Sequence, residues 1–154
     1  MNEAVVAGAL AVATLNAVAA ADGLWSYWRG AEQEASGRAF WLLLRVGQGA
    51  VLTLAIAVGS LTAAGKHSHD HLFYLYALLP IAIALVAEQL RLASAQAVLD
   101  QRGLEDSAAV GLLGEREQHE LMGAIVRREL GTMALSALVV VFLALRAAGT
   151  AHGF

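Results

Sequence analysis

The sequence contains no cysteine, a single proline and a single lysine. The lack of cysteine excludes disulfides, thiolate metal sites, haem attachment through cysteine and cysteine nucleophiles. Catalytic motifs are lacking too: there is no nucleophile elbow, phosphate-binding loop or dinucleotide fingerprint, and the His119-Glu120 pair lacks the second histidine of a zinc-protease motif. No basic run is typical of nucleic-acid binding. These absences favour a protein that is not an enzyme and has no nucleic-acid partner.

Charged residues are also few, at 15% of 154 residues, whereas 58% are hydrophobic and the mean hydropathy is +0.61. A soluble domain has about 25% charged residues. A helix needs about 20 apolar residues to cross a bilayer core of about 30 Å, and four segments qualify: residues 4–24, 40–64, 72–97 and 121–145. The sequence therefore predicts an all-α integral membrane protein, a single four-span domain. Short connections make neighbouring helices antiparallel, as in an up-down four-helix bundle.

The basic residues predict the orientation of this bundle. Two, Lys66 and Arg146, lie on one side; the other eight lie in or beside the connections on the opposite side: Arg29, Arg38, Arg45, Arg91, Arg102, Arg116, Arg127 and Arg128. Lys and Arg collect on the cytoplasmic side, and aromatic residues such as Trp25 and Trp28 mark the same boundary. We therefore expect both termini outside (N-out/C-out). The Arg- and Ala-rich composition is typical of a GC-rich genome, so we expect a bacterial inner (plasma) membrane.

The third and fourth segments are less apolar than the others near their cytoplasmic ends. We expect them to belong to longer helices that extend into the cytoplasm, the third through Asp100 and the fourth from Glu115. Between them, Asp106 or Ser107 is a candidate N-cap of a short amphipathic helix over residues 107–113, which Gly114 would close.

Charged residues enter the spans at one depth, near the cytoplasmic edge of the membrane core. They are Arg45, Glu88, Arg91, Arg127, Arg128 and Glu129. Along a helix axis, Glu88 lies roughly 24 Å from Leu72, and Arg128 lies about 27 Å from Arg146. Glu88 and Arg91 are three residues apart and can pair within one helix. We also expect Glu88 to pair with Arg45 or Arg128. Residues 127–129 are consecutive on one helix, so at least one of them must point away from the bundle interior, toward the membrane interface.

This charged belt has two interpretations. It is either structural, with ion pairs between helices, or a site in which four arginines against two acids attract an anion such as a lipid phosphate or a carboxylate ligand. Both fit a non-enzymatic scaffold or accessory subunit whose partners are membrane lipid and a second copy of the chain or another membrane subunit. The alternative function is a small oligomeric channel or transporter that uses the same cluster.

The outer connection carries a second candidate site, formed by His67, His69, Asp70 and His71. In an extended loop, alternate residues lie on one side, and imidazoles with a carboxylate suit Zn, Cu or Ni. This pattern is consistent with a transition-metal site, and a metal- or haem-linked redox protein is a further alternative function. In a rival geometry, Ser68 or Asp70 is the N-cap of the third helix, which places the three histidine rings on different faces.

One uncharged polar residue, Asn16, lies in the middle of the first segment. An amide at this depth usually forms a hydrogen bond across a helix interface. Thr53, Thr132 and Ser136 lie at matching depths, so we expect one of them to be its partner.

Overall fold

The chain forms long helices in this computed structural model, which describes residues 2–29, 34–103, 110, 111 and 113–151. The helices are α1 (Asn2–Arg29), α2 (Glu34–Ala63), α3 (His71–Gln101) and α5 (Glu115–Thr150), and the described residues contain no strand. All four are long and apolar enough to cross a membrane, which confirms the predicted all-α fold with four such helices. The amphipathic helix expected over residues 107–113 lies largely outside the described residues.

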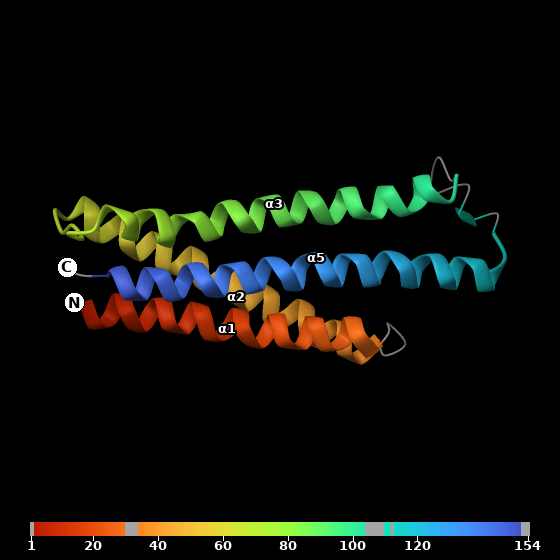
Figure 1. Cartoon of the computed structure of the whole chain (residues 1–154), viewed down its shortest axis with the longest axis horizontal. Coiled ribbons are helices and arrows are strands. Elements are labelled where there is room, and N and C mark those ends of the chain that lie inside the picture. The colour runs from red at the N-terminus through yellow and green to blue at the C-terminus, as the bar shows by residue number, and fades with distance from the viewer. Residues whose placement is uncertain (1, 30–33, 104–109, 112, 152–154) are drawn as a thin grey trace.

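The helices alternate in direction (Figure 1). The N-terminus, the end of α5 and the connection between α2 and α3 lie at one end of the molecule, which we call the terminal end. At the other end, α3 and α5 run on together past the ends of α1 and α2 (Figure 1). Pro80 lies inside α3, which continues through it from His71 to Gln101.

The helices do not pack equally closely. α5 packs along both α1 and α3, and α1 packs along α2, whereas α2 and α3 have little contact with one another. Figure 1 shows the reason: α2 crosses behind the other helices, from beside α1 at one end to beside α3 at the terminal end. Away from the terminal end, therefore, only long side chains can connect α2 with α3.

Small residues allow the close contacts of α1. A Cβ added at Gly23 would lie 2.5 Å from Cε2 of Phe40 on α2 and 2.9 Å from Cβ of Ala134 on α5. Atoms at these separations overlap, so glycine is required for this three-helix contact. The core near it is formed by Ala20, Phe40, Leu44, Ala87, Leu130, Met133, Ala134 and Ala137. A second core, nearer the terminal end, includes Val12, Val51, Phe73 and Val140.

Candidate functional site: an ion-pair network between three helices

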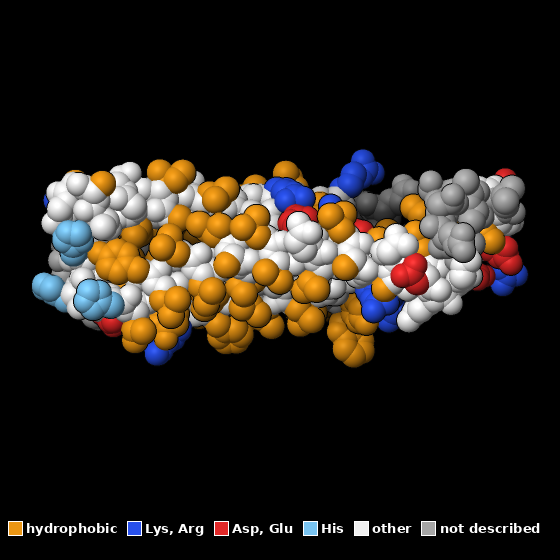
Figure 2. Space-filling view, turned by 90° about the horizontal axis from the view of Figure 1, so that it is seen from above, with side chains coloured by type: hydrophobic (Ala, Val, Ile, Leu, Met, Phe, Trp, Pro, Cys, Tyr) orange, Lys and Arg blue, Asp and Glu red, His pale blue; other side chains and the backbone are white. Residues whose placement is uncertain are grey.

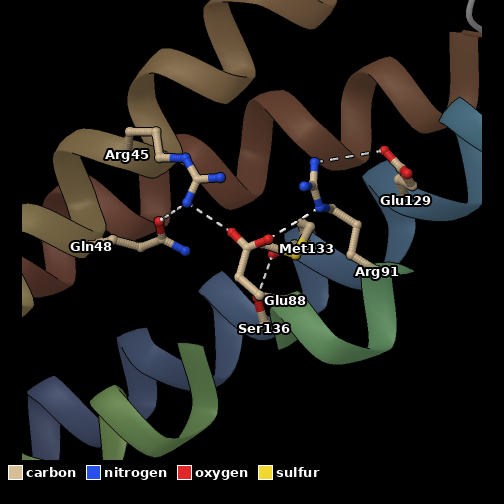
Figure 3. Close-up of polar contacts among 7 residues, drawn as sticks. All are labelled: Arg45, Gln48, Glu88, Arg91, Glu129, Met133 and Ser136. Atoms are coloured by element: carbon tan, nitrogen blue, oxygen red, sulfur yellow. Dashed lines mark hydrogen bonds and ion pairs between the residues drawn. The ribbon is translucent and has the colours of Figure 1, made fainter. Parts of the chain in front are cut away.

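Four charged side chains from three helices form a continuous chain of ion pairs (Figure 3). Nη1 of Arg45 on α2 lies 2.7 Å from Oε1 of Glu88 on α3. The other carboxylate oxygen, Oε2, lies 3.1 Å from Nε of Arg91, one turn further along α3. Nη1 of Arg91 in turn lies 4.0 Å from Oε2 of Glu129 on α5. We call these four residues the ion-pair network.

The network spans the region in which α2 has diverged from α3. Arg45 lies one turn after Trp41 and one turn before Gln48, so all three occupy one side of α2. Nη1 of Arg45 donates a hydrogen bond of 2.8 Å to Oε1 of Gln48, and the guanidinium carbon of Arg91 lies 5.1 Å from the centre of the Trp41 ring, a cation–π contact. Two long side chains on each helix therefore connect α2 and α3, whose backbones are far apart.

The residues of the network also share a depth. Counted from the helix ends at the terminal end, Arg45, Glu88, Arg91 and Glu129 all lie about 25–32 Å along their helices, at 1.5 Å per residue. This matches the thickness of a membrane core, about 30 Å. If the terminal end lies at one surface of a membrane, this distance places the four charges at the opposite boundary of its core, where a charge needs either a partner or access to headgroups.

The side chains within the network differ in exposure. The exposed fraction of the side chain is 26% for Glu88, 28% for Arg91 and 20% for Glu129, whereas it is 54% for Arg45. The two arginines and two carboxylates balance in charge, and each carboxylate has an arginine partner. The structure therefore pairs Glu88 with Arg45 rather than with Arg128, the other partner considered from the sequence.

The remaining two arginines of the belt lie elsewhere. Arg127 and Arg128 are exposed on α5. The guanidinium carbon of Arg127 lies 4.8 Å from the centre of the Tyr27 ring on α1, and the Arg128 side chain forms no ion pair with any described residue. The six belt residues thus separate into a paired network of four and two exposed arginines that do not belong to it.

Three residues near this level were not assigned to the belt from the sequence. Trp41 and Gln48 of α2 are two of them. The signal that links both to Arg45 is helical spacing, since they lie four residues before it and three after it. Asp22 of α1 lies at a similar distance from the terminal end, and its Oδ2 atom is buried without a hydrogen-bond partner among the described residues. The feature of the sequence that could have identified Asp22 is the presence of a carboxylate about 20 residues into the first span.

The histidine loop between α2 and α3 adopts the capping geometry. Asp70 is the N-cap of α3, and its Oδ1 accepts a hydrogen bond of 2.9 Å from the backbone N–H of Leu72. The side chains of His67, His69 and His71 are exposed, and Figure 2 shows histidines spread over the terminal end. Within the described parts of the chain, no three His, Cys, Asp or Glu side chains lie close enough together to hold a metal ion.

Hydrogen bonds of the backbone also stabilise this connection. α2 ends at Ala63, and Gly65, two residues later, has a φ of +79°, a left-handed conformation that favours glycine. The Lys66 N–H donates to the Leu61 carbonyl at 3.0 Å. The Ser68 N–H donates to Oη of Tyr74 at 2.9 Å. The loop is therefore shaped by the helix ends that it joins.

Asn16 does not form the interhelical hydrogen bond that we expected. Its Nδ2 donates to the Val12 carbonyl of its own helix at 2.9 Å. The buried side chain packs against Gly47 of α2, where a Cβ would lie 3.0 Å from Oδ1 of Asn16. An intrahelical bond satisfies only part of the amide's capacity, but it allows α1 and α2 to approach closely at Gly47.

The fold and the network define a protein with four helices that can cross a membrane, three of them connected by ion pairs at one level. Comparison with known protein families finds no family that matches this chain. Comparisons with curated proteins and with solved structures find no match either.

Proposed function

We propose that this chain is a non-enzymatic component of a bacterial inner membrane, a scaffold or accessory subunit that binds anionic lipid at its cytoplasmic end. In this proposal both termini face outward and the ends of α3 and α5 extend into the cytoplasm. The observation that carries it is the pairing within the ion-pair network. Charges that neutralise one another hold helices together, whereas a transport site needs charged groups open to a cargo.

The lipid-binding part of the proposal rests on Arg127 and Arg128. Both lie on α5 near the level of the network, both are exposed, and neither has an acidic partner among the described residues. A guanidinium at this depth can extend toward the headgroups and bind phosphate through two parallel hydrogen bonds. Each basic residue near an anionic membrane surface contributes about 1 kcal/mol to lipid attraction.

Lipid retention tests this part directly. We expect Arg127→Ala/Arg128→Ala to lower the amount of phosphatidylglycerol retained relative to phosphatidylcholine by about 10–30-fold, the equivalent of two such charges. Native mass spectrometry of protein purified from mixed bilayers measures the ratio. The matched control is Arg116→Ala, because Arg116 is exposed on the same helix but is paired with Glu120. Equal retention by the control and the double variant would contradict the proposal.

Orientation can be tested separately because the chain has no cysteine. We expect His69→Cys to react with a membrane-impermeant maleimide in intact cells, and Glu117→Cys to react only after the membrane is opened. Both side chains are exposed, so accessibility depends on the side of the membrane alone. The reverse labelling pattern would show that the termini are cytoplasmic.

A further inference from the structure

The outer face of α3 carries an amide that has no partner. Gln89 is exposed, and its side chain forms no hydrogen bond with any residue that the structure describes. It lies about 27 Å along α3 from His71, within the segment that can cross the membrane. A polar group that faces lipid without a partner is unfavourable. Gln89 lies at the level of the ion-pair network, so its hydrogen-bonding partner comes from outside this chain, either from a lipid headgroup or from another helix.

The other uncharged polar side chains of the spans do not share this property. Exposed hydroxyls bond to a carbonyl one turn earlier in the same helix: Thr14 to Leu10 at 2.9 Å, Thr53 to Gly49 at 2.9 Å, Ser60 to Ile56 at 2.8 Å and Thr132 to Arg128 at 3.0 Å. Gln48 accepts from Arg45, and Gln96 donates to Asp100. The unpaired amide thus distinguishes the α3 face from the outer faces of the other helices.

The residues around Gln89 follow the spacing of a helix–helix seam. Exposed positions recur at alternating intervals of three and four residues: Leu75, Leu78, Ala82, Leu85, Gln89 and Leu92, with the leucines between 48% and 65% exposed. Such spacing forms the a and d positions of a left-handed helix pair, and one polar residue at an a position sets the register. A shallow hollow lined by Leu85, Val86, Gln89, Leu90 and Ala93 provides room for side chains of a facing helix.

We infer that the outer face of α3 binds α3 of a second copy of this chain, with the two Gln89 side chains hydrogen-bonded to one another. A carboxamide has both a donor and an acceptor, so an identical amide related by a two-fold axis satisfies both groups. Identical chains insert in the same orientation, which places both Gln89 residues at the same depth. The contact is therefore self-complementary. It gives the proposed scaffold its protein partner but does not depend on lipid binding by Arg127 or Arg128.

Single-cysteine cross-linking in lipid vesicles tests this contact. Because the chain has no cysteine, Ala82→Cys and Leu85→Cys each place a single thiol in the seam. The control is Leu135→Cys on α5, where Leu135 is 57% exposed. We expect mild oxidation to give covalent dimers of the two α3 variants at least 10-fold faster than of Leu135→Cys. Equal rates, or faster cross-linking through α5, would overturn the inference.

Gln89 itself is tested by substitution. Interhelical hydrogen bonds in membranes change association by about 3–20-fold, so we expect Gln89→Leu to weaken dimerisation by that factor in a vesicle FRET titration. Gln89→Asn keeps a shorter amide and should fall between wild type and Gln89→Leu. The exposed position leaves the core intact, and an unchanged helix content verifies folding. If Gln89→Leu associates as strongly as wild type, or if wild type is monomeric, the inference is overturned. The proposed function is tested separately, by lipid retention of the arginine variants.

Discussion

Glu88 is the residue on which the ion-pair network depends most, because each of its two carboxylate oxygens lies within ion-pair distance of a different arginine. Glu88→Gln keeps the size of the side chain but removes its charge, which leaves Arg45 without an acidic partner in the network and leaves Arg91 only Glu129 at 4.0 Å. Breaking a buried ion pair costs about 3–5 kcal/mol, whereas exposed pairs contribute about 0.2–1 kcal/mol. The side chain of Glu88 is 26% exposed, so we expect Glu88→Gln to lower the free energy of unfolding by about 1.5–3 kcal/mol, between these limits.

Thermal unfolding in detergent measures this effect. A loss of that size lowers the melting temperature of a protein this long by about 3–12 °C. The matched control is Glu120→Gln, which makes the same change in an exposed pair on α5, where Nε of Arg116 lies 3.2 Å from Oε1 of Glu120. Exposed pairs four residues apart on a helix contribute only about 0.3–0.5 kcal/mol, so this control should melt close to wild type.

A double-mutant cycle separates the interhelical pair from the intrahelical one. Arg45→Met alone, Glu88→Gln alone and both together should give a coupling energy of about 0.5–2 kcal/mol, which is typical of residues in direct contact. Arg45 is half-exposed, so the lower part of this range is expected. Equal melting temperatures of Glu88→Gln and Glu120→Gln, or a coupling energy of zero, would refute the structural role that we assign to the network.

The packing and capping contacts make two further predictions. Gly23→Ala should destabilise the protein by about 1–3 kcal/mol in the same assay, because its Cβ would overlap Phe40, whereas Gly49→Ala has nothing within 4 Å and should be neutral or stabilising. Asp70→Ala should cost about 0.5–2 kcal/mol by removing the α3 N-cap, whereas Asp70→Asn, which can also accept the Leu72 N–H, should stay near wild type. A stable Gly23→Ala, or equal melting temperatures of the two Asp70 variants, would contradict these assignments.

The fold class and the depth of the charges could be predicted from local features of the sequence. Apolar length is a local property, since a helix that crosses a bilayer must satisfy its own backbone hydrogen bonds, and four segments of sufficient length could therefore be counted without a structure. Depth follows from rise per residue, so Arg45, Glu88 and Glu129 could be placed at one level. The i, i+3 pairing of Glu88 with Arg91 is likewise a property of one helix, and the structure contains it.

Which charges meet could not be predicted in the same way, because depth does not specify the direction in which a side chain points. Arg45 and Arg128 were equally good partners for Glu88 by depth. α2 runs diagonally across the bundle (Figure 1), and Arg45 reaches Glu88 at 2.7 Å, whereas Arg128 is exposed on α5 and forms no ion pair with any described residue. The bond of Asn16 within its own helix has the same cause, because α1 and α2 approach so closely at Gly47 that the amide lies against the α2 backbone. Helix lengths and depths are encoded by neighbouring residues, but partner choice depends on how helices cross, which is set by the sum of many small packing contacts between distant segments.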